Sequence, residues 1–260
     1  MKTNNFLKKR ILTWYIENGV YTSLYSLPCS EPYKNNFHSK VTSYNKNKID
    51  SSKKEIDSFQ EKKNTVEHIY SNTLADLKEE IKNTNSCSLK KTAKNFVFGD
   101  GNPESDVMLL GEAPGEEEDK SGVPFVGQAG KLLDKMLAAI GQNRKNTYLS
   151  NIIFWRPPGN RNPTDEEINL CLPYVYKHIE IVRPKILILA GSIAAKAILN
   201  DHSQGITQLR GKWQNVKISN SNNLLPAMPI FHPAFLLRQP ARKREAWEDL
   251  KNIKKAIDML

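Results

Sequence analysis

Residues 111–130 read GEAPGEEEDKSGVPFVGQAG, and this stretch decides the fold. It follows the apolar run 106–110 and leads into the periodic apolar segment 129–140, so a strand, a loop and a helix are predicted in that order. The loop contains five glycines and two prolines. Open α/β sheets build their sites on loops at the carboxyl ends of strands, and glycines let the backbone approach a ligand closely. The stretch therefore predicts a binding site.

The alternation of strand and helix continues from this stretch to the C-terminus. Thr164 has Glu167 three residues later, which is the spacing of a capping box at a helix start. Further helices are expected from Ser192 and from about Ala241. The predicted strands are 106–111, 147–153, 185–190 and 227–232. Strands that alternate with helices indicate an α/β fold, in which helices cover both faces of a parallel sheet.

The N-terminal third of the chain has a different composition. Of 13 glycines only Gly19 lies before residue 99, and so do only two of the 14 prolines. Because a compact fold needs turns, we predict a main domain over residues 84–260 and an N-terminal extension over residues 1–83. Within the extension we expect helices at 4–18 and 53–83, joined by a disordered linker rich in Asn, Lys and Ser.

The charge and cysteine content narrow the partners and the compartment. Lys and Arg exceed Asp and Glu by 38 − 28 = 10, which favours a nucleic acid partner over a membrane surface, although lysine-rich composition can also reflect an AT-rich genome. Three cysteines, Cys29, Cys87 and Cys171, do not form a disulfide framework. No apolar run approaches the ~20 residues of a membrane helix. We therefore expect a cytoplasmic protein that does not bind membranes.

Three loops that follow predicted strands carry the candidate functional residues. The first contains Glu112, Glu118 and Phe125, the second follows Asn151, and the third begins at His232. The carboxyl ends of parallel strands meet at one edge of a sheet, so these loops should converge. Each residue has an ordinary alternative, since Phe125 could pack in the core and Asn151 or His232 could satisfy backbone groups. The set favours a site, because it combines a carboxylate, an amide, an aromatic face and an imidazole.

These four groups suit the recognition of a flat heterocycle. The ring of such a ligand would stack on Phe125, and the Asn151 amide would read its edge with one donor and one acceptor. Glu112 would position water. His232 would donate a hydrogen bond to an oxygen on which negative charge develops.

Apolar and basic residues near these groups are candidates for contacts with nucleic acid. Leu236 and Leu237 are adjacent on the third loop and could wedge into a base stack, with core packing as the alternative. Side chains that could contact phosphates, or else form a solvated surface, are Arg156, Arg161, Arg210, Arg238 and Lys243.

Residues 84–260 resemble the family 4 uracil-DNA glycosylases, the iron–sulfur type of bacteria and archaea. The matching runs are VFGDGNP (97–103), GEAPGEEED (111–119), PFVGQAGKLL (124–133), NIIFWRPPGNRNPT (151–164), RGKW (210–213) and HPAFLLR (232–238). Residues 12–19, LTWYIENG, look like the start of α-proteobacterial members. The resemblance implies a three-layer α/β/α sandwich with a central four-stranded parallel sheet. It also implies hydrolysis of the N-glycosidic bond of deoxyuridine by a protein expected to be a monomer.

The resemblance also implies a role for each candidate residue. Glu112 and Glu118 are carboxylates tied to water and site geometry, and His232 stabilises the departing uracil anion as the third catalytic group. The uracil-binding set is Gly111, Ala113, Phe125 and Asn151. The DNA-binding set is Asn160, Arg161, Leu236, Leu237 and Arg238. A related type, family 5, usually has an uncharged residue where this chain has Glu112.

The chain departs from the family at the iron–sulfur cluster. The family holds a [4Fe–4S] cluster with four cysteines, and only Cys87 and Cys171 match those positions. Thr84 and Trp155 stand at the other two. Such a cluster takes about four thiolate ligands, and Cys29 is disfavoured as a third because it lies in the extension. We therefore expect the cluster to be lost and no cofactor to be bound.

Two other functions fit parts of the sequence. One is a catalytically weak DNA-binding homologue that has lost activity together with the cluster. Glu112, Asn151 and His232 are all present, which disfavours this alternative. The other is a phosphate-binding enzyme that uses the glycine-rich loop. That loop lacks both the Gly-Lys-Ser/Thr and the Gly-x-Gly-x-x-Gly spacing, so the second alternative is weaker still.

Overall fold

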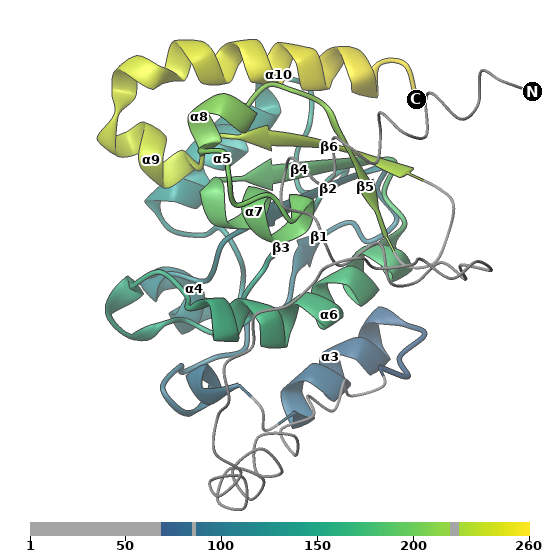
Figure 1. Ribbon diagram of the computed structural model, residues 1–260, viewed down its shortest axis with the longest axis vertical. Coiled ribbons are helices and arrows are strands. Elements are labelled where there is room, and N and C mark those ends of the chain that lie inside the picture. Colours follow the sequence, from purple (N-terminus) through teal and green to yellow (C-terminus); the bar gives the residue numbers. More distant parts are fainter. Residues whose placement is uncertain (1–68, 85–86, 219–223) are drawn as a thin grey trace, which may run out of the picture. The chain divides into compact units, whose positions relative to one another are not determined.

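A six-stranded sheet lies at the centre of the computed structural model, which describes residues 69–84, 87–218 and 224–260 (Figure 1). The strand order is β1-β3-β2-β4-β6-β5. The strands are β1 (Asp100–Gly101), β2 (Val107–Gly111), β3 (Tyr148–Asn151), β4 (Ile186–Ala190), β5 (Gln214–Lys217) and β6 (Leu224–Ile230). The helix expected at 4–18, the linker at 31–52 and most of the helix expected at 53–83 lie outside the described residues.

The four predicted strands are the central, parallel part of this sheet. β2 pairs in parallel with β3 and β4, and β4 pairs in parallel with β6. The expected count of four was incomplete, because β1 and β5 add an antiparallel strand at each edge. β1 has only two residues and β5 reads Gln-Asn-Val-Lys, so neither carries an apolar pattern that predicts a strand.

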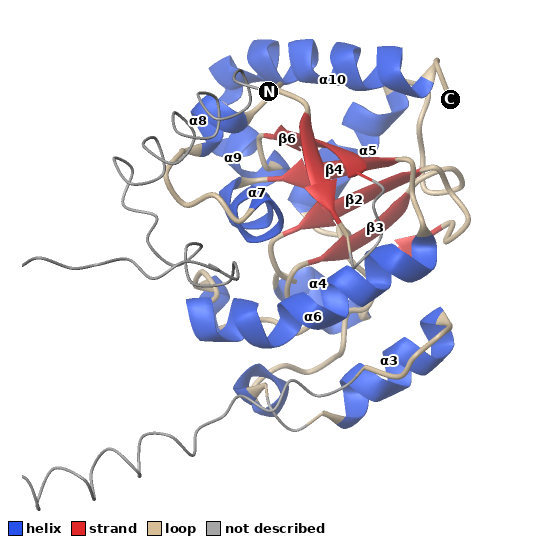
Figure 2. Cartoon of the chain, turned by 45° about the vertical axis from the view of Figure 1, so that its right-hand side comes forward, coloured by secondary structure: helices blue, strands red, loops and turns tan. Residues whose placement is uncertain are grey.

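Helices cover both faces of the sheet (Figures 1 and 2). Met108, Leu110 and Leu187 point into one core cluster, which contains residues of α6 (Asp165–Val182) and α7 (Ser192–Leu199). Val107, Leu109 and Ile188 point into the other, which contains residues of α5 (Gln128–Ala138), α9 (Pro233–Arg238) and α10 (Lys243–Ile257). Alternate residues of a strand face opposite sides of the sheet, so both faces of the sheet are buried under helices. The expected three-layer α/β/α sandwich is therefore confirmed.

Helix α3 (Leu74–Asn83) belongs to the same compact unit as the sheet. Its Leu77 and Ile81 are fully buried in the core cluster that contains residues of α6. The boundary expected at residue 84 therefore falls after a helix that already packs on the domain. The apolar spacing of α3 predicted a helix, but only long-range packing could place that helix against α6.

The start of α6 has the predicted capping box. The Thr164 hydroxyl accepts a hydrogen bond from the Glu167 N–H at 3.2 Å, and the Glu167 carboxylate accepts one from the Thr164 N–H at 2.8 Å. The shorter elements are α4 (Glu116–Ser121), α8 (Ile206–Leu209) and the 3-10 turns Ser88–Lys91, Pro158–Asn160 and Pro240–Arg242. Among the described helices, none has both the length and the apolar content needed to cross a bilayer.

Candidate active site

An aromatic ring and an amide meet at Gly111, the last residue of β2. Gly111 and Asn151 are register partners where the parallel strands β2 and β3 end. A Cβ atom added to Gly111 would lie 2.4 Å from Asn151 Oδ1 and 2.4 Å from Phe125 Cζ. Phe125 and Asn151 are buried, with 5% and 3% of their surface exposed. Only glycine therefore lets both side chains approach the end of β2.

Phe125 has an unusual backbone conformation. Its φ is 56°, in the left-handed region that costs an ordinary L-residue roughly 1–2 kcal/mol. A Cβ atom at Gly130, in the first turn of α5, would lie only 1.8 Å from the Phe125 carbonyl oxygen. The glycine therefore leaves room for this carbonyl. The fold therefore holds a strained residue beside the end of β2.

Glu118 uses its carboxylate to hold the loop around Phe125. Its Oε1 accepts hydrogen bonds from the N–H groups of Val126 and Gly127, each at 2.9 Å. Its Oε2 accepts one from the N–H of Gly115 at 3.1 Å. Both oxygens are bound to backbone N–H groups, which fits the expected tie of Glu118 to site geometry, and its expected tie to water stays a prediction. Glu118 positions the loop that carries Phe125.

His232 begins helix α9 and lies beside Phe125. The two ring centroids are 6.2 Å apart and their planes are inclined by 30°. His232 Nδ1 accepts a hydrogen bond from the Ala234 N–H at 3.1 Å. Burial, followed by the positive charge of Arg238, lowers the pKa of His232 to about 4. The imidazole is therefore neutral at pH 7, and because Nδ1 is an acceptor, its proton is on Nε2.

Glu112 and Ala113 continue the loop directly after Gly111. Glu112 is half-buried, and its burial raises the pKa of its carboxyl while the charge of Arg238 opposes that rise. The Glu112 carbonyl accepts a hydrogen bond from the Ile153 N–H at 3.0 Å, which ties the first candidate loop to the second. Ala113 is partly buried and packs against the core cluster that contains residues of α6. Of these two side chains, only the carboxylate of Glu112 is suited to polar chemistry.

The two leucines of the third loop differ in exposure. Leu236 is 1% exposed and belongs to the core cluster that contains residues of α5 and α10, whereas Leu237 is 43% exposed. Adjacent residues on a helix point about 100° apart, so a short helix that packs on the core exposes one of them. The expectation that Leu236 enters DNA is therefore wrong. Leu237 is the exposed apolar candidate, and Arg238 beside it is also exposed.

Three of the candidate phosphate contacts are in ion pairs within the protein, and in one of these Arg156 lies 3.7 Å from the carboxylate of Glu116. Arg161 donates to both carboxylate oxygens of Glu167, at 2.9 and 2.7 Å. Arg210 is bound by Asp249, whose side chain is buried, and its guanidinium lies 5.1 Å from the centroid of the Phe231 ring. Arg210 is therefore a structural residue and not the phosphate contact suggested by the sequence. Its partner lies 39 residues away, so no local pattern could reveal the pair.

Asn160 lies at the end of the second loop, where it and the preceding Gly159 both have a positive φ. Its φ is 56°, and its side-chain oxygen accepts a hydrogen bond from Arg156 Nε at 2.6 Å. Asn160 is exposed. The contact orients Arg156 on the surface of this loop.

The residues at the expected cluster position do not fit an iron–sulfur cluster. Cys87 and Cys171 are both buried free thiols, and the interaction with Cys171 lowers the pKa of Cys87 to about 7. Trp155 is 4% exposed, and its ring centroid lies 5.2 Å from that of Phe96. Thr84 caps α3 at its C-terminal end. Two sulfurs packed against aromatic rings do not supply the four ligands of a cluster. Among the described residues, no group of three or more His, Cys, Asp or Glu side chains is arranged so that it could hold a metal ion. Cys29 lies outside the described residues.

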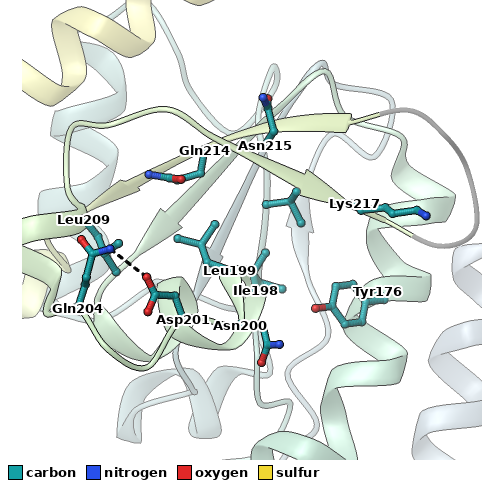
Figure 3. Close-up of a pocket in the computed structure, with 11 residues that line it drawn as sticks. Tyr176, Ile198, Leu199, Asn200, Asp201, Gln204, Leu209, Gln214, Asn215 and Lys217 are labelled. Atoms are coloured by element: carbon teal, nitrogen blue, oxygen red, sulfur yellow. Dashed lines mark hydrogen bonds between the residues drawn. The ribbon is translucent and has the colours of Figure 1, made fainter. Parts of the chain in front are cut away.

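A pocket of about 340 Å³ lies away from these residues (Figure 3). It is lined by residues of α6, of the segment after α7 and of β5, among them Tyr176, Asp201 and Lys217. None of the candidate site residues lines it. The site at Gly111 is therefore defined by converging side chains and not by this pocket.

Arg144 is absent from the site residues predicted from the sequence, yet it contacts the backbone of Phe125. Arg144 lies between α5 and β3, in the polar run Asn143–Asn146, and donates to the Phe125 carbonyl at 2.5 Å. A single arginine in a polar turn is typical of a solvated surface. Only the folded structure, which brings this turn to the loop after β2, distinguishes it from other basic residues.

Comparisons with known proteins place these residues in one family of sequences. The model of the Uracil DNA glycosylase superfamily matches residues 98–251. The type-4 uracil-DNA glycosylase of Archaeoglobus fulgidus is 38% identical over 182 residues, which cover 70% of this chain and 92% of that protein. The type-4 uracil-DNA glycosylase of Sulfurisphaera tokodaii is 38% identical over 186 residues, with 70% and 84% covered. That of Pyrobaculum aerophilum is 39% identical over 180 residues, with 68% and 91% covered.

Proposed function

Because this chain belongs to the uracil DNA glycosylase superfamily, we propose a mechanism by which its site removes uracil from DNA. The chain is a uracil-DNA glycosylase, which hydrolyses the N-glycosidic bond between uracil and deoxyribose and leaves an abasic site for base excision repair. One observation carries the mechanism: Phe125 and Asn151 meet at Gly111, and the ring of His232 lies beside that of Phe125.

The first step is binding of a uracil that has left the base stack. Extruding a base costs a few kcal/mol, and stacking on an aromatic face together with hydrogen bonds to the base edge offsets that cost. The edge of uracil presents an N–H donor beside a carbonyl acceptor. The Asn151 amide supplies the complementary acceptor and donor. The close packing of Phe125 at Gly111 is expected to exclude the methyl group of thymine.

The second step is cleavage of the bond between N1 of uracil and C1′ of the sugar. As this bond breaks, its electron pair passes to the base and negative charge develops on the uracil oxygens. The neutral imidazole of His232 donates its Nε2–H to one of these oxygens, where a donor held in place is most effective. Water adds to C1′ and loses a proton, which reaches the uracil anion through solvent, so that the products are an abasic sugar and neutral uracil. The carboxylate of Glu112 is the group that orients this water and faces the positive charge of the sugar.

The third element is the contact with DNA outside the base pocket. Leu237 and Arg238 are exposed on α9, directly after the turn that holds His232. Leu237 fills the space that the extruded base leaves, and Arg238 contacts a phosphate. The monomeric state and the cytoplasmic location stay predictions from the sequence.

A uracil-release assay tests this function directly. The protein should liberate free uracil from single- and double-stranded oligonucleotides that carry one deoxyuridine, and it should leave an abasic site that alkali cleaves. Matched oligonucleotides with thymine at the same position should stay intact. A protein that binds the uracil oligonucleotide but never releases uracil would be the DNA-binding homologue, and the proposed mechanism would fail.

We further propose that the iron–sulfur cluster of the family is lost in this chain. Protein purified without oxygen should contain far less than one iron per chain and should lack the broad visible absorption of such clusters, because two buried sulfurs beside Trp155 cannot replace four ligands. Colorimetric iron analysis and an absorption spectrum measure this. If the wild-type protein instead contains stoichiometric iron, and a Cys87→Ala, Cys171→Ala double variant does not, then the chain binds a cluster and the proposal is wrong.

A further inference from the structure

We propose that Arg144 is a positioning residue for uracil excision, because it holds the backbone of Phe125 in the conformation that places the ring at Gly111. This inference rests on the proposed role of Phe125 as the stacking surface. Arg144 itself has no place in the chemical steps. It acts through the loop that carries the aromatic ring.

The guanidinium of Arg144 binds two successive carbonyl groups of that loop. Its Nη2 donates to the Phe125 carbonyl oxygen at 2.5 Å, and its Nη1 donates to the Pro124 carbonyl oxygen at 3.1 Å. The Arg144 side chain is 27% exposed, so water competes only in part for these donors. Hydrogen bonds from a charged donor are stronger than those between neutral groups. The two peptide planes next to the Phe125 Cα are therefore tied to one cation.

Two carboxylates hold the guanidinium in place. Asp100, in strand β1, accepts from Arg144 Nη1 at 2.6 Å, and Asp134, in helix α5, accepts from Arg144 Nε at 3.1 Å. Asp100 precedes the loop that carries Phe125 in the sequence, and Asp134 follows it. A planar guanidinium with five donors can serve two carbonyls and two carboxylates together, whereas an ammonium group cannot. The short edge strand β1 thus supplies an anchor for the arginine.

A second charged group binds the same loop on the other side of Phe125. Glu118 accepts the N–H groups of Val126 and Gly127, as described above. Arg144 therefore binds the last two carbonyl groups up to and including Phe125, and Glu118 binds the first two N–H groups after it. Between these bonds Phe125 keeps a φ of 56°, which L-residues rarely adopt. Without Arg144 the peptide plane between Phe125 and Val126 is held only by Glu118, so that the φ of Phe125 relaxes towards negative values and the ring moves away from Gly111 and His232.

The test compares single-turnover uracil release by wild-type protein and by an Arg144→Ala variant. The variant should release uracil about 10- to 100-fold more slowly, the range expected when a substrate-positioning group shifts by about 1 Å. Its affinity for uracil-containing DNA should change much less than its rate, because Arg144 binds the protein's own backbone. The matched control is Lys145→Ala, which removes the same charge from an exposed neighbour and should keep the wild-type rate.

A double-mutant cycle with Phe125→Ala separates positioning from general destabilisation. If Arg144 acts through the ring, Arg144→Ala should cause no further slowing when Phe125 is already alanine. Equal slowing in both backgrounds would overturn the inference and leave the proposed function intact. A Phe125→Ala variant with the wild-type rate would instead contradict the stacking role, and with it the proposed mechanism.

A milder variant covers the case in which Arg144→Ala does not fold. Asp134→Ala keeps both bonds from the guanidinium to the carbonyls but removes one anchor. It should slow uracil release by a smaller factor, and that factor should again vanish in the Phe125→Ala background. Circular dichroism at the assay temperature confirms that each variant is folded. An Asp134→Ala variant that is folded and has the wild-type rate, beside an unfolded Arg144→Ala variant, would assign Arg144 a structural role only.

Discussion

An Asn151→Asp variant should release uracil at least about a hundredfold more slowly than the wild-type protein. The Asn151 side chain is 3% exposed and its Oδ1 lies against Gly111, so the amide is fixed at the end of β3. Replacing the amide with a carboxylate removes the only donor of this side chain and puts a negative charge beside a base that becomes an anion. Loss of one donor to a developing oxyanion typically costs about 10²- to 10³-fold in rate.

The measurement is single-turnover release of uracil from a labelled oligonucleotide. The matched control is Asn169→Asp, the same change at an exposed position of α6, and it should keep the wild-type rate. A thermal melt of both variants shows whether the buried carboxylate has unfolded the protein. If a folded Asn151→Asp protein is fully active, Asn151 does not read the base and the binding step must be assigned to other groups.

Replacement of His232 by alanine should also slow uracil release, by about 10²- to 10³-fold. In the proposed mechanism, the imidazole is the group that faces the departing base as a neutral donor. His202→Ala, the same change at an exposed position between α7 and α8, should be without effect. A His232→Ala protein that is folded and has the wild-type rate would mean that another group stabilises the uracil anion.

The pH dependence of the wild-type rate distinguishes a neutral imidazole from a charged one. The pKa of His232 is lowered from 6.5 to about 4, so the imidazole stays neutral as the pH falls through 6.5. Its contribution to the rate should be constant from about pH 8 to pH 5 and should fall only as the pH approaches 4. Protonation there gives Nδ1 a hydrogen and breaks its bond with the Ala234 N–H. An inflection near pH 6.5 that is absent from the His232→Ala variant would instead indicate an active imidazolium.

The same shift affects stability, with a defined sign. The unfolded chain binds a proton at His232 near pH 6.5, whereas the folded chain binds it only near pH 4. The contribution of His232 to the free energy of unfolding should therefore decrease as the pH falls from 6.5 towards 4, whereas Asp249, whose pKa burial raises to about 6, contributes with the opposite sign. Buried His178, whose pKa is lowered to about 3 by burial, adds to this decrease. Rates at low pH must be measured well below the melting temperature, so that loss of folded protein is not read as loss of catalysis.

The convergence of the three candidate loops was predictable, because each predicted strand can be recognised from a few neighbouring residues and each candidate loop directly follows one. The apolar runs before Gly111, Asn151 and His232 predicted strands, and parallel strands place the residues at their carboxyl ends along one edge. The capping box at Thr164 was predictable for the same reason, since a helix start depends on neighbours in the sequence. The family resemblance then supplied the substrate.

The partners of individual side chains were not predictable from the chain alone. Leu236 and Leu237 are identical in type and adjacent, yet the packing of α9 buries the first and exposes the second. Arg210 and Arg144 are both basic residues in polar runs, yet the first pairs with Asp249 and the second holds the loop of Phe125. Glu118 was expected to be tied to water and site geometry, but the backbone N–H groups that it binds could not be named from the sequence.

The sequence by itself determined the order and type of the elements, the parallel core of the sheet and the chemical groups available at its edge. These follow from periodicity and from residue type, which act over a few neighbouring positions. The tertiary structure alone decided which of these groups meet at the end of β2 and which hold the backbone. That choice depends on contacts between residues far apart in the chain, such as Arg144 with Asp100, and on the space that Gly111 leaves between two strands.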